Sequence, residues 1–515
     1  MLSCAYSAGL CGIDGFIVNV ECNCTKHMSC FEIVGLPDNA IKEAKERVRS
    51  ASLNSGYGFP DCEIIVNLAP ADIKKEGSSF DLAILISLLQ ASGKISLAQD
   101  LSDICFIGEL SLSGDIRPVR GVLCMAICAL QNGKKKIFVP VENAKEASVI
   151  DGLEVYGVKN VCEVINHLTG YAEIQKYTYE DDEETNSYSC PDFADVKGQA
   201  RVKRAVEIAA AGGHNILLIG PPGTGKSMIA KRIPSILPEM TFDESIETTK
   251  IHSISGNLKD GVSLIRTRPF RSPHHTMSTT SLVGGGRIPM PGEISLANNG
   301  VLFLDELPEF NKQATEALRQ PLEDGAVTIT RASGRIKYPC SFMLVCAMNP
   351  CRCGYYGHPT HQCTCRSDDI KRYLGKISGP LLDRIDIQIE VPSLTYSELS
   401  KNENKEETSS EIRKRVNNAR KFAQNRFSND KTDNGIKISC NAQMESRHIR
   451  KYCELDDSCK TLMEKAYNSL GLSARGHDRI LRLARTIADL DNSESIKPKH
   501  IAEAIQLRSL DKKYF

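Results

Sequence analysis

The chain has 515 residues, enough for about three domains with cores of their own. Its 64 basic and 64 acidic residues cancel, so no overall charge attracts nucleic acid or a membrane surface, and any polyanion site must be local. No run approaches the roughly 18 apolar residues of a membrane-spanning helix, and residues 1–20 lack the basic start of a signal peptide, which favours a cytoplasmic protein.

Residues 1–170 mix short strand-like and helical patterns. The runs FIVNVEC, EIIVNLA and KKIFVP are rich in β-branched residues and predict strands. The segments AIKEAKERVRSASL and FDLAILISLLQASG have the length and apolar spacing of helices. We expect an α+β domain here, followed by an acidic, solvated linker over residues 171–192 that contains YTYEDDEETNSYS.

A phosphate-binding loop opens the next domain, which we expect over residues 193–395. The segment NILLIGPPGTGKSMIAKRI predicts a strand, a glycine-rich loop and a helix, and it matches G-x-x-x-x-G-K-[ST] in the required context. The backbone N–H groups of such a loop surround phosphates. The predicted loop residues are Gly220, Pro221, Pro222, Gly223, Thr224 and Gly225, with Lys226 reaching the β- and γ-phosphates and Ser227 ligating Mg²⁺.

The apolar run VLFL predicts a buried strand that ends in two carboxylates, Asp305 and Glu306. Asp305 suits a contact with Mg²⁺, and Glu306 suits the base that orients an attacking water molecule. Such a pair alone is more often a solvated turn. The phosphate loop earlier in the chain favours the catalytic interpretation.

Two β-rich runs around Ser-Gly, AVTITRASGRIKYP, predict a hairpin after this strand. Arg331, Arg335 and Lys337 give it positive charge, which suits contacts with phosphates, although three cations on a hairpin are more often simply solvated. The arm RTRPFRSPHH adds Arg266, Arg268 and Arg271, with Phe270 as a stacking group for a base. Packing of this arm against its own domain is an equally good interpretation.

The strand-like run SFMLVCAM ends in Asn349, which can reach a γ-phosphate or the water that attacks it. Directly after it, NPCRCGYYGHPTHQCTC carries the only ligand-like spacing among the 20 cysteines of the chain. Thiolates of Cys351, Cys353, Cys363 and Cys365 can close a tetrahedral Zn²⁺ site, and His358 or His361 could replace one of them. The alternative is four reduced cysteines in a loop, but metal would supply folding energy that so small a loop lacks.

Residues 396–515 predict only helices after the polar break SKNENKEETSSE: EIRKRVNNARKFAQNRF, CKTLMEKAYNSLG, GHDRILRLARTIADL and KHIAEAIQLRSL. Two arginines near this region have candidate roles. Arg384 precedes the strand-like IQIEVP, and Arg475 opens the third of these helices. Either could equally be an ordinary surface residue.

The order of these motifs resembles the AAA+ superfamily, specifically the magnesium-chelatase-like YifB/ComM family. The signatures RPFRSPHHTMS, GGGRIPMPGEISLANNGVLFLDELPEF and AMNPCRCGYYG carry the resemblance, which runs along nearly the whole chain. It implies an α/β AAA+ core with a helical C-terminal lid, a hexameric ring, and hydrolysis of ATP with Mg²⁺. Asn349 would be sensor 1, Arg384 the finger placed in a neighbour's site, and Arg475 sensor 2. Asn298 departs from the histidine expected there.

The resemblance also implies a substrate for the motor. The best-described activity of the family is ATP-driven branch migration of DNA, so single-stranded or branched DNA is the expected partner, as in recombination or natural transformation. In related ring motors, the hairpin that corresponds to residues 326–339 of this chain points into the pore. The main alternative is a chelatase-type motor that remodels a protein partner. Such motors usually work with a subunit carrying an integrin-like metal-binding fold, of which this chain has no segment.

The N-terminal region resembles the Lon-protease fold. The nucleophilic serine of the protease would fall near Ser79 in KKEGSSFDLAIL. Its partner lysine would align with Leu123, which cannot act as a base, and a serine without a base is a weak nucleophile. We therefore expect a scaffold or partner-binding domain without proteolytic activity.

Overall fold

The computed structural model describes residues 1–26, 29–179, 190–259, 261–286, 289–331, 334–358, 360–394, 406–428, 430–433, 435, 437–510 and 514. Residues 180–189 of the expected acidic linker, and residues 400–405 of the second polar break, lie outside these ranges. The chain divides into two compact units. The N-terminal unit comprises Met1–Asn186, Phe242–Ile265 and Thr330–Tyr338, and the C-terminal unit comprises Ser187–Thr241, Arg266–Ile329 and Pro339–Phe515.

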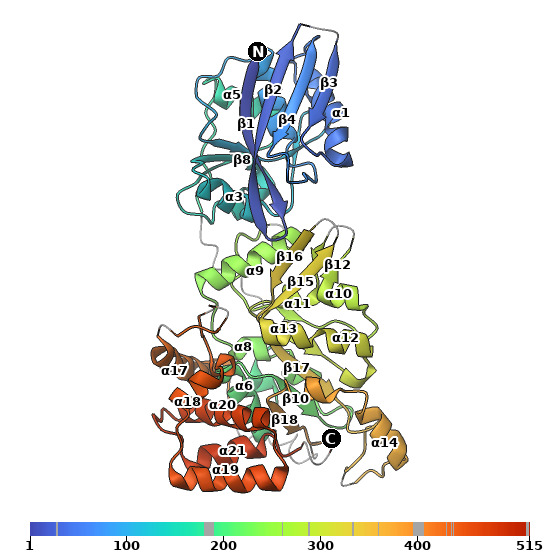
Figure 1. Cartoon of the computed structure of the whole chain (residues 1–515), viewed down its shortest axis with the longest axis vertical. Helices are drawn as coiled ribbons and strands as arrows, with labels where there is room; N and C mark the ends of the chain where they lie inside the picture. The colour runs from blue at the N-terminus through green and yellow to red at the C-terminus, as the bar shows by residue number, and fades with distance from the viewer. Residues whose placement is uncertain are drawn as a thin grey trace. The chain divides into compact units, whose positions relative to one another are not determined.

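A four-stranded sheet of order β1–β2–β4–β3 begins the N-terminal unit (Figure 1). Strands β1, β2 and β4 are antiparallel neighbours and β3 is parallel to β4. Two helices pack on this sheet, and their buried apolar residues form its core. The strands predicted at FIVNVEC and EIIVNLA and both predicted helices are confirmed as β2 (Asp14–Thr25), β4 (Glu63–Ala69), α1 (Asn39–Asn54) and α2 (Asp81–Ala91). Strands β1 (Leu2–Cys11) and β3 (Cys30–Val34) were not predicted.

The second half of the N-terminal unit is a three-stranded parallel sheet of order β5–β8–β9. Helices and turns connect these strands, because parallel neighbours need crossover connections. The elements are β5 (Ile104–Phe106), β6 (Glu109–Leu110), β7 (Ile116–Arg117), α3 (Val122–Gln131), β8 (Lys136–Pro140), α4 (Val141–Ala147), β9 (Glu154–Val158) and α5 (Val161–Leu168).

Two segments from within residues 193–395 pack in the N-terminal unit rather than with the rest of that range. One is α9 (Phe242–Ser255), where the backbone N–H of Gly121 donates to Ser253 Oγ at 3.0 Å and Ser253 donates to the buried Glu146. The other is the tip of the hairpin formed by β15 (Ala326–Arg331) and β16 (Gly334–Pro339). Buried polar contacts therefore tie α9 to this unit, and the contact of Ile336 with Gly12 ties the hairpin to it.

The C-terminal unit contains a five-stranded, fully parallel sheet of order β11–β14–β17–β10–β18. Its strands are β10 (Ile216–Ile219), β11 (Phe270–Arg271), β14 (Val301–Leu304), β17 (Met343–Met348) and β18 (Ile387–Glu390). The three central strands are buried along their whole length, which explains their unbroken apolar runs. The carboxyl ends of parallel strands meet at one edge, where this architecture places ligands.

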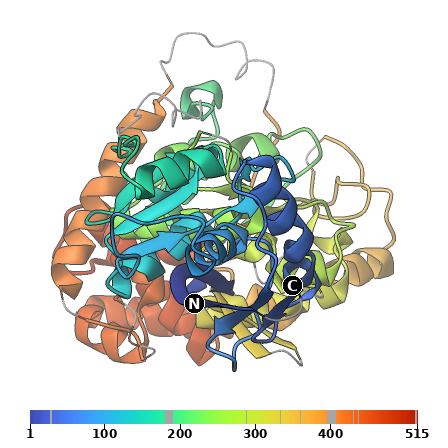
Figure 2. The same cartoon turned by 90° about the horizontal axis from the view of Figure 1, so that it is seen from above.

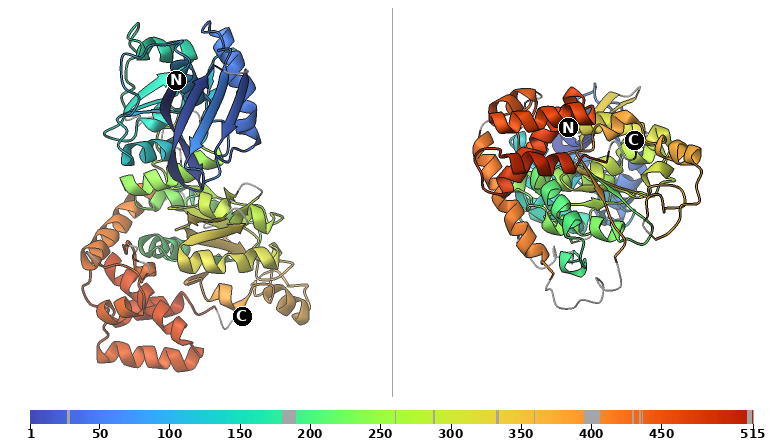
Figure 3. Two further views of the ribbon diagram at one scale, coloured as in Figure 1. Left: turned by 45° about the horizontal axis from the view of Figure 1, so that its top comes forward. Right: turned by 90° about the horizontal axis from the view of Figure 1, so that it is seen from below.

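Helices and small elements precede or connect these strands (Figure 3, left). They are η1 (Phe193–Asp195), α6 (Ala200–Gly212), α7 (Lys226–Ala230), α8 (Ile233–Ile236), α10 (Thr279–Val283), β12 (Gly284–Gly285), β13 (Met290–Pro291), α11 (Glu293–Leu296), η2 (Leu307–Glu309), α12 (Lys312–Ala317), α13 (Arg319–Asp324), α14 (Ser367–Leu374) and α15 (Gly379–Leu382).

The four C-terminal helices predicted from the sequence are confirmed and lie together as one group (Figures 2 and 3, orange and red). They are α17 (Ser409–Phe427), α19 (Asp457–Leu470), α20 (Ala474–Leu490) and α21 (Pro498–Gln506), with η3 (Asn441–Gln443) and α18 (Ser446–Tyr452) between them. Within the described ranges, every helix falls short, in length or in apolar character, of what a bilayer crossing requires.

Candidate nucleotide site and cysteine cluster

The loop between β10 and α7 lies at the carboxyl edge of the parallel sheet. Gly223 and Gly225 have φ of 79° and 83°, a left-handed conformation that glycine adopts without a Cβ clash. Lys226 begins α7, and its Nζ donates to the carbonyl oxygens of Gly220 at 2.7 Å and Pro221 at 2.8 Å. The loop thus has the backbone of a phosphate cradle, with its lysine turned into it.

Asn349 joins this loop to the neighbouring strand. Because β17 lies between β10 and β14, Asn349 follows a strand flanked by those that lead to Lys226 and to Asp305. Its Oδ1 accepts a hydrogen bond from Lys226 Nζ at 3.1 Å. Burial lowers the pKa of Lys226 to about 8, although Asp305 and Glu306 oppose that shift. The lysine is therefore easier to deprotonate than an exposed one.

Ser227 and Asp305 form the oxygen-rich part of the site. Ser227 Oγ donates to Asp305 Oδ2 at 2.6 Å, and the other oxygen, Oδ1, accepts from the backbone N–H of Glu306 at 3.0 Å. A hydroxyl and a carboxylate at this separation can both face one hard cation such as Mg²⁺. The sheet order thus brings together five predicted residues from three strand ends.

Glu306 has a neighbour that sequence reasoning missed. Its backbone is left-handed, with φ of 53°, and its half-exposed carboxylate lies 3.5 Å from Nδ1 of His275. The His275 ring meets the edge of Phe310 at 6.4 Å between centroids. The only sequence signal was the histidine pair in SPHH, which gives no indication that its second member would lie beside the carboxylate.

Among the contacts of the described residues, Arg384 pairs away from the nucleotide site, and Arg475 is exposed. The Arg384 side chain is only 9% exposed and pairs with Glu323. It also donates to the Pro380 carbonyl at 2.5 Å. Arg475 is exposed in the first turn of α20. Both roles assigned to them from the family resemblance stay predictions.

A buried polar network connects the helical group to the sheet. His214 contacts Asp386, just before β18, at 3.2 Å and Thr486 on α20 at 2.8 Å. Burial opposes ionisation of Asp386, but His214 and nearby arginines including Arg479 hold its pKa down at about 2. Asn441 extends the network from Thr486 to Asp489. Because these groups are buried and paired, they fix how α20 lies on the core.

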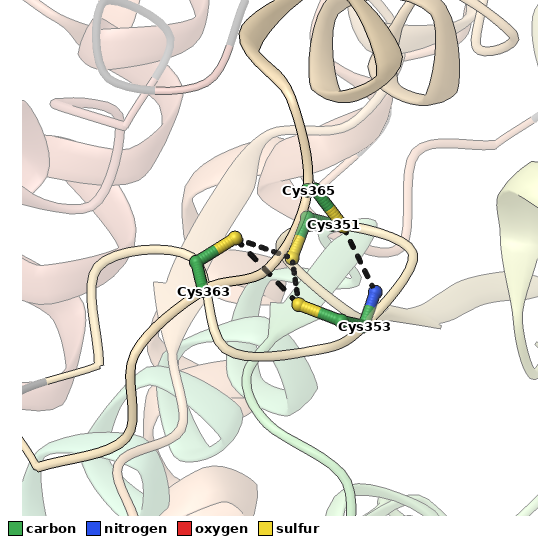
Figure 4. Close-up of side chains that lie close together, drawn as sticks. All are labelled: Cys351, Cys353, Cys363 and Cys365. Carbon is green, nitrogen blue, oxygen red and sulfur yellow. Dashed lines mark hydrogen bonds between the residues drawn. The ribbon is translucent and has the colours of Figure 1, made fainter.

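The four predicted cysteines converge at the end of the loop that follows Asn349 (Figure 4). Their sulfur atoms all lie within 4.8 Å of one another. Burial would raise the pKa of the Cys353 thiol, but backbone N–H groups of Tyr355 and Thr364 and the neighbouring thiols lower it to about 5. His358 instead contacts Ser393 at 2.9 Å, and the His361 ring lies tilted against Tyr355, with 5.1 Å between centroids. Thiolates alone are therefore the candidate ligand set.

The hairpin β15–β16 presents two different faces. Ile336 contacts Gly12, where an added Cβ would lie 2.5 Å from its Cγ2, and Tyr338 is buried. Arg335 and Lys337 alternate with these residues and are exposed. The side chain of Arg331 lies outside the described residues.

The arm over residues 266–275 packs against its own unit. Arg268 donates to the Asn299 carbonyl at 2.7 Å, and Arg271 forms two 2.6 Å bonds with the Glu293 carboxylate. The Phe270 ring stacks on Phe303 at 6.0 Å, against the core. The contacts favour the packing interpretation for these three residues over contact with DNA. Arg266 is exposed.

The protease-like positions of the N-terminal unit are filled by packing. Ser79 is buried, with its hydroxyl 3.5 Å from the Ala8 carbonyl. Leu123 is fully buried and packs with Val149 and Leu264. Asn298, the departure from the family pattern, is buried and accepts from the Ser341 N–H at 2.7 Å, a contact that does not involve the predicted nucleotide residues.

Comparisons with known proteins match all three parts of the chain. The family model for magnesium chelatase subunit ChlI matches residues 192–399. A second model, for subunit ChlI of Mg-chelatase, matches residues 20–143, and a third, for the C-terminal part of magnesium chelatase subunit ChlI, matches residues 406–508. Competence protein ComM of Haemophilus influenzae is 43% identical over 512 residues, 99% of this chain and 98% of that protein. The uncharacterized protein YifB of Escherichia coli is 42% identical over 516 residues, with the same coverage.

A partial match connects the N-terminal unit to a protease. Lon protease 2 of Bacillus subtilis is 30% identical over 128 residues, 25% of this chain and 22% of that protein. This agrees with the predicted relationship of the N-terminal fold to Lon.

Proposed function

Because this chain belongs to the YifB/ComM family of magnesium-chelatase-like ATPases, we propose that it is a hexameric ring motor that couples ATP hydrolysis to movement along DNA. Branch migration in recombination or natural transformation is the activity we infer. The name of the Haemophilus influenzae relative, a competence protein, supports a role in handling DNA.

In the proposed site, Lys226 and the N–H groups of the Gly220–Gly225 loop bind the phosphates. Ser227 and Asp305 hold Mg²⁺, which supplies charge neutralisation for the transferred phosphoryl group. Glu306 takes the proton of the attacking water, and Asn349 orients that water or the γ-phosphate. The hydrogen bonds that already link Lys226 to Asn349 and Ser227 to Asp305 support these assignments.

The low pKa of Lys226 predicts that nucleotide affinity falls in mild alkali. A charged lysine attracts phosphates and a neutral one does not, so affinity should be retained below pH 8 and lost above it. Between pH 7.5 and pH 9 the Kd for MgATP should rise about tenfold, as the charged fraction drops. Calorimetric titration at the two pH values measures this. The Lys226→Arg variant stays charged throughout, so its affinity should not change between them. A wild-type Kd that is equal at both values would contradict the assignment.

The alternation along β16 is the observation that carries the proposal for DNA. Ile336 and Tyr338 face the N-terminal unit, which leaves Arg335 and Lys337 exposed on the opposite face of the strand. Ile336 and Tyr338 anchor β16, so its two cations are presented by a strand that is held in place. On a protein without net charge, such a local basic face is where phosphates would bind.

The test is ATPase activity with and without single-stranded DNA and four-way junctions, over a series of salt concentrations. We expect DNA to stimulate hydrolysis, and the stimulation to weaken as salt rises. Replacing Arg335 and Lys337 together by alanine should weaken DNA binding and reduce the salt dependence of log K by about 1.4 for single-stranded DNA. Lys42 and Arg49, two exposed cations of α1, provide a control pair with the same loss of charge.

Two results would contradict the proposal that the motor acts on DNA. If the double alanine variants of β16 and of α1 weakened DNA binding equally, the hairpin would make no specific contact with DNA. Hydrolysis that ignores DNA at every salt concentration would point instead to a motor that remodels a protein partner.

A further inference from the structure

The loop over residues 350–366 has little apolar material with which to fold. Cys351 is fully buried, while Arg352, Tyr356 and Gly357 are exposed. Several of the contacts that close the loop on itself are made to sulfur. The N–H of Tyr356 donates to Cys351 Sγ at 3.3 Å, and the N–H of Cys353 donates to Cys365 Sγ at 3.4 Å. Backbone N–H groups directed at sulfur stabilise thiolates.

The sulfur atoms have the spacing of a metal site. The Sγ–Sγ distances are 3.3 Å for Cys351–Cys353, 3.7 Å for Cys351–Cys363 and 3.6 Å for Cys353–Cys363. A tetrahedron with Zn–S bonds of about 2.3 Å has edges of about 3.8 Å. None of the four cysteines is in a disulfide, and Figure 4 shows the sulfur atoms of Cys351, Cys353 and Cys363 facing one another. This geometry suits a thiolate-preferring divalent ion such as Zn²⁺.

One residue between the ligands touches the phosphate loop. Gly354 is buried, with φ of 89°, and an added Cβ would lie 2.5 Å from Cδ of Pro222. Its N–H donates to the Cys351 carbonyl at 3.0 Å, so its position follows from that of the first ligand. Pro222 belongs to the loop that begins at Gly220. The cysteine loop therefore backs directly onto the nucleotide site.

We propose that the four cysteines bind zinc, and that the zinc-bound loop is a support for the phosphate loop through the contact of Gly354 with Pro222. The inference rests on the proposed nucleotide site. The ion holds Cys351 and Cys353, which both lie in the turn that ends at Gly354, and Gly354 limits where Pro222 can lie. Loss of the ion releases this restraint, and the phosphate loop loses its preorganised shape.

The Gly354→Ala variant tests the contact with the phosphate loop without removing any metal ligand. All four ligands remain, but the new methyl group collides with the Pro222 ring. We expect this variant to keep one zinc per chain, measured by metal analysis, and to bind MgATP about tenfold more weakly. Gly357→Ala is the matched control, because Gly357 lies in the same loop and also has a positive φ, 75°, but is exposed. It should bind MgATP as the wild type does.

If the Gly354→Ala variant does not fold, a second measurement on the wild-type protein tests the same proposal. Wild-type protein stripped of metal with a chelator should show faster hydrogen exchange in residues 220–225 and weaker MgATP binding, and added Zn²⁺ should restore both. Wild-type protein without stoichiometric metal would overturn the proposal, as would equal affinities of the two glycine variants or unchanged binding after stripping. A failure of the proposed nucleotide site is distinguishable, because metal-loaded wild type would then not bind MgATP at all.

Discussion

Replacing Glu306 with glutamine should lower kcat for ATP about 1,000-fold while leaving the affinity for MgATP close to that of the wild type. General base catalysis contributes about 100- to 10,000-fold, and an amide of the same shape cannot take the proton of the attacking water. Glu306 lies next to Asp305 but does not itself contact Ser227, so the oxygen pair expected to hold Mg²⁺ remains. Steady-state ATPase assays and nucleotide titration give the two quantities.

Glu309→Gln is the control for this prediction. Glu309 lies one turn further along the chain and pairs with Lys376 at 3.1 Å on the exposed side. Removing its charge should change kcat less than twofold, as expected for an exposed ion pair. If Glu306→Gln retained a tenth or more of the wild-type rate, another group would have to be the base. His275, 3.5 Å from Glu306, would be examined first.

Replacing Arg384 with alanine should lower kcat about 1,000-fold, at the lower end of what an arginine finger supplies. The guanidinium would stabilise charge that develops on the phosphate of a neighbouring subunit. In a single chain it does not reach the site of its own subunit and pairs with Glu323. Nucleotide affinity should therefore change much less than the rate, because the lost contact matters most in the transition state.

Mixing two inactive variants tests whether Arg384 acts on a neighbour. A ring that contains both Arg384→Ala and Glu306→Gln subunits has some interfaces where an intact Glu306 meets an intact Arg384. Equal mixtures should therefore show ATPase activity well above the residual rate of either variant alone. No recovery in mixed assemblies of confirmed composition would contradict a role between subunits.

Glu323→Gln distinguishes the finger from a structural ion pair. If Arg384 only stabilised its own subunit through Glu323, removing the carboxylate would reproduce the loss seen in Arg384→Ala. If Arg384 acts on a neighbour, Glu323→Gln should keep most of the activity, because it releases the guanidinium and does not remove it. The ratio of the two rates therefore decides between the explanations.

The sequence by itself determined the features that depend on neighbouring residues. The phosphate loop, the apolar strand before Asp305 and Glu306, and the C-terminal helices are each encoded within about 20 residues, through backbone requirements and apolar periodicity. The spacing of the four cysteines also belongs to this class, because two close pairs can converge after a single turn of the chain. Motif order along the chain then sufficed to identify the family.

The tertiary structure alone decided which of these features meet. Placing β17 between β10 and β14 brings Asn349 to Lys226, and nothing local in either segment encodes that order. The contacts of His275 with Glu306 and of Gly354 with Pro222 likewise join segments far apart in sequence. The positions of α9 and β16 also depend on distant residues, because both pack in the N-terminal unit although the sequence around them belongs to the other unit. Short-range patterns specify conformation, but partners across the fold are selected by packing, burial and buried hydrogen bonds, which no single segment contains.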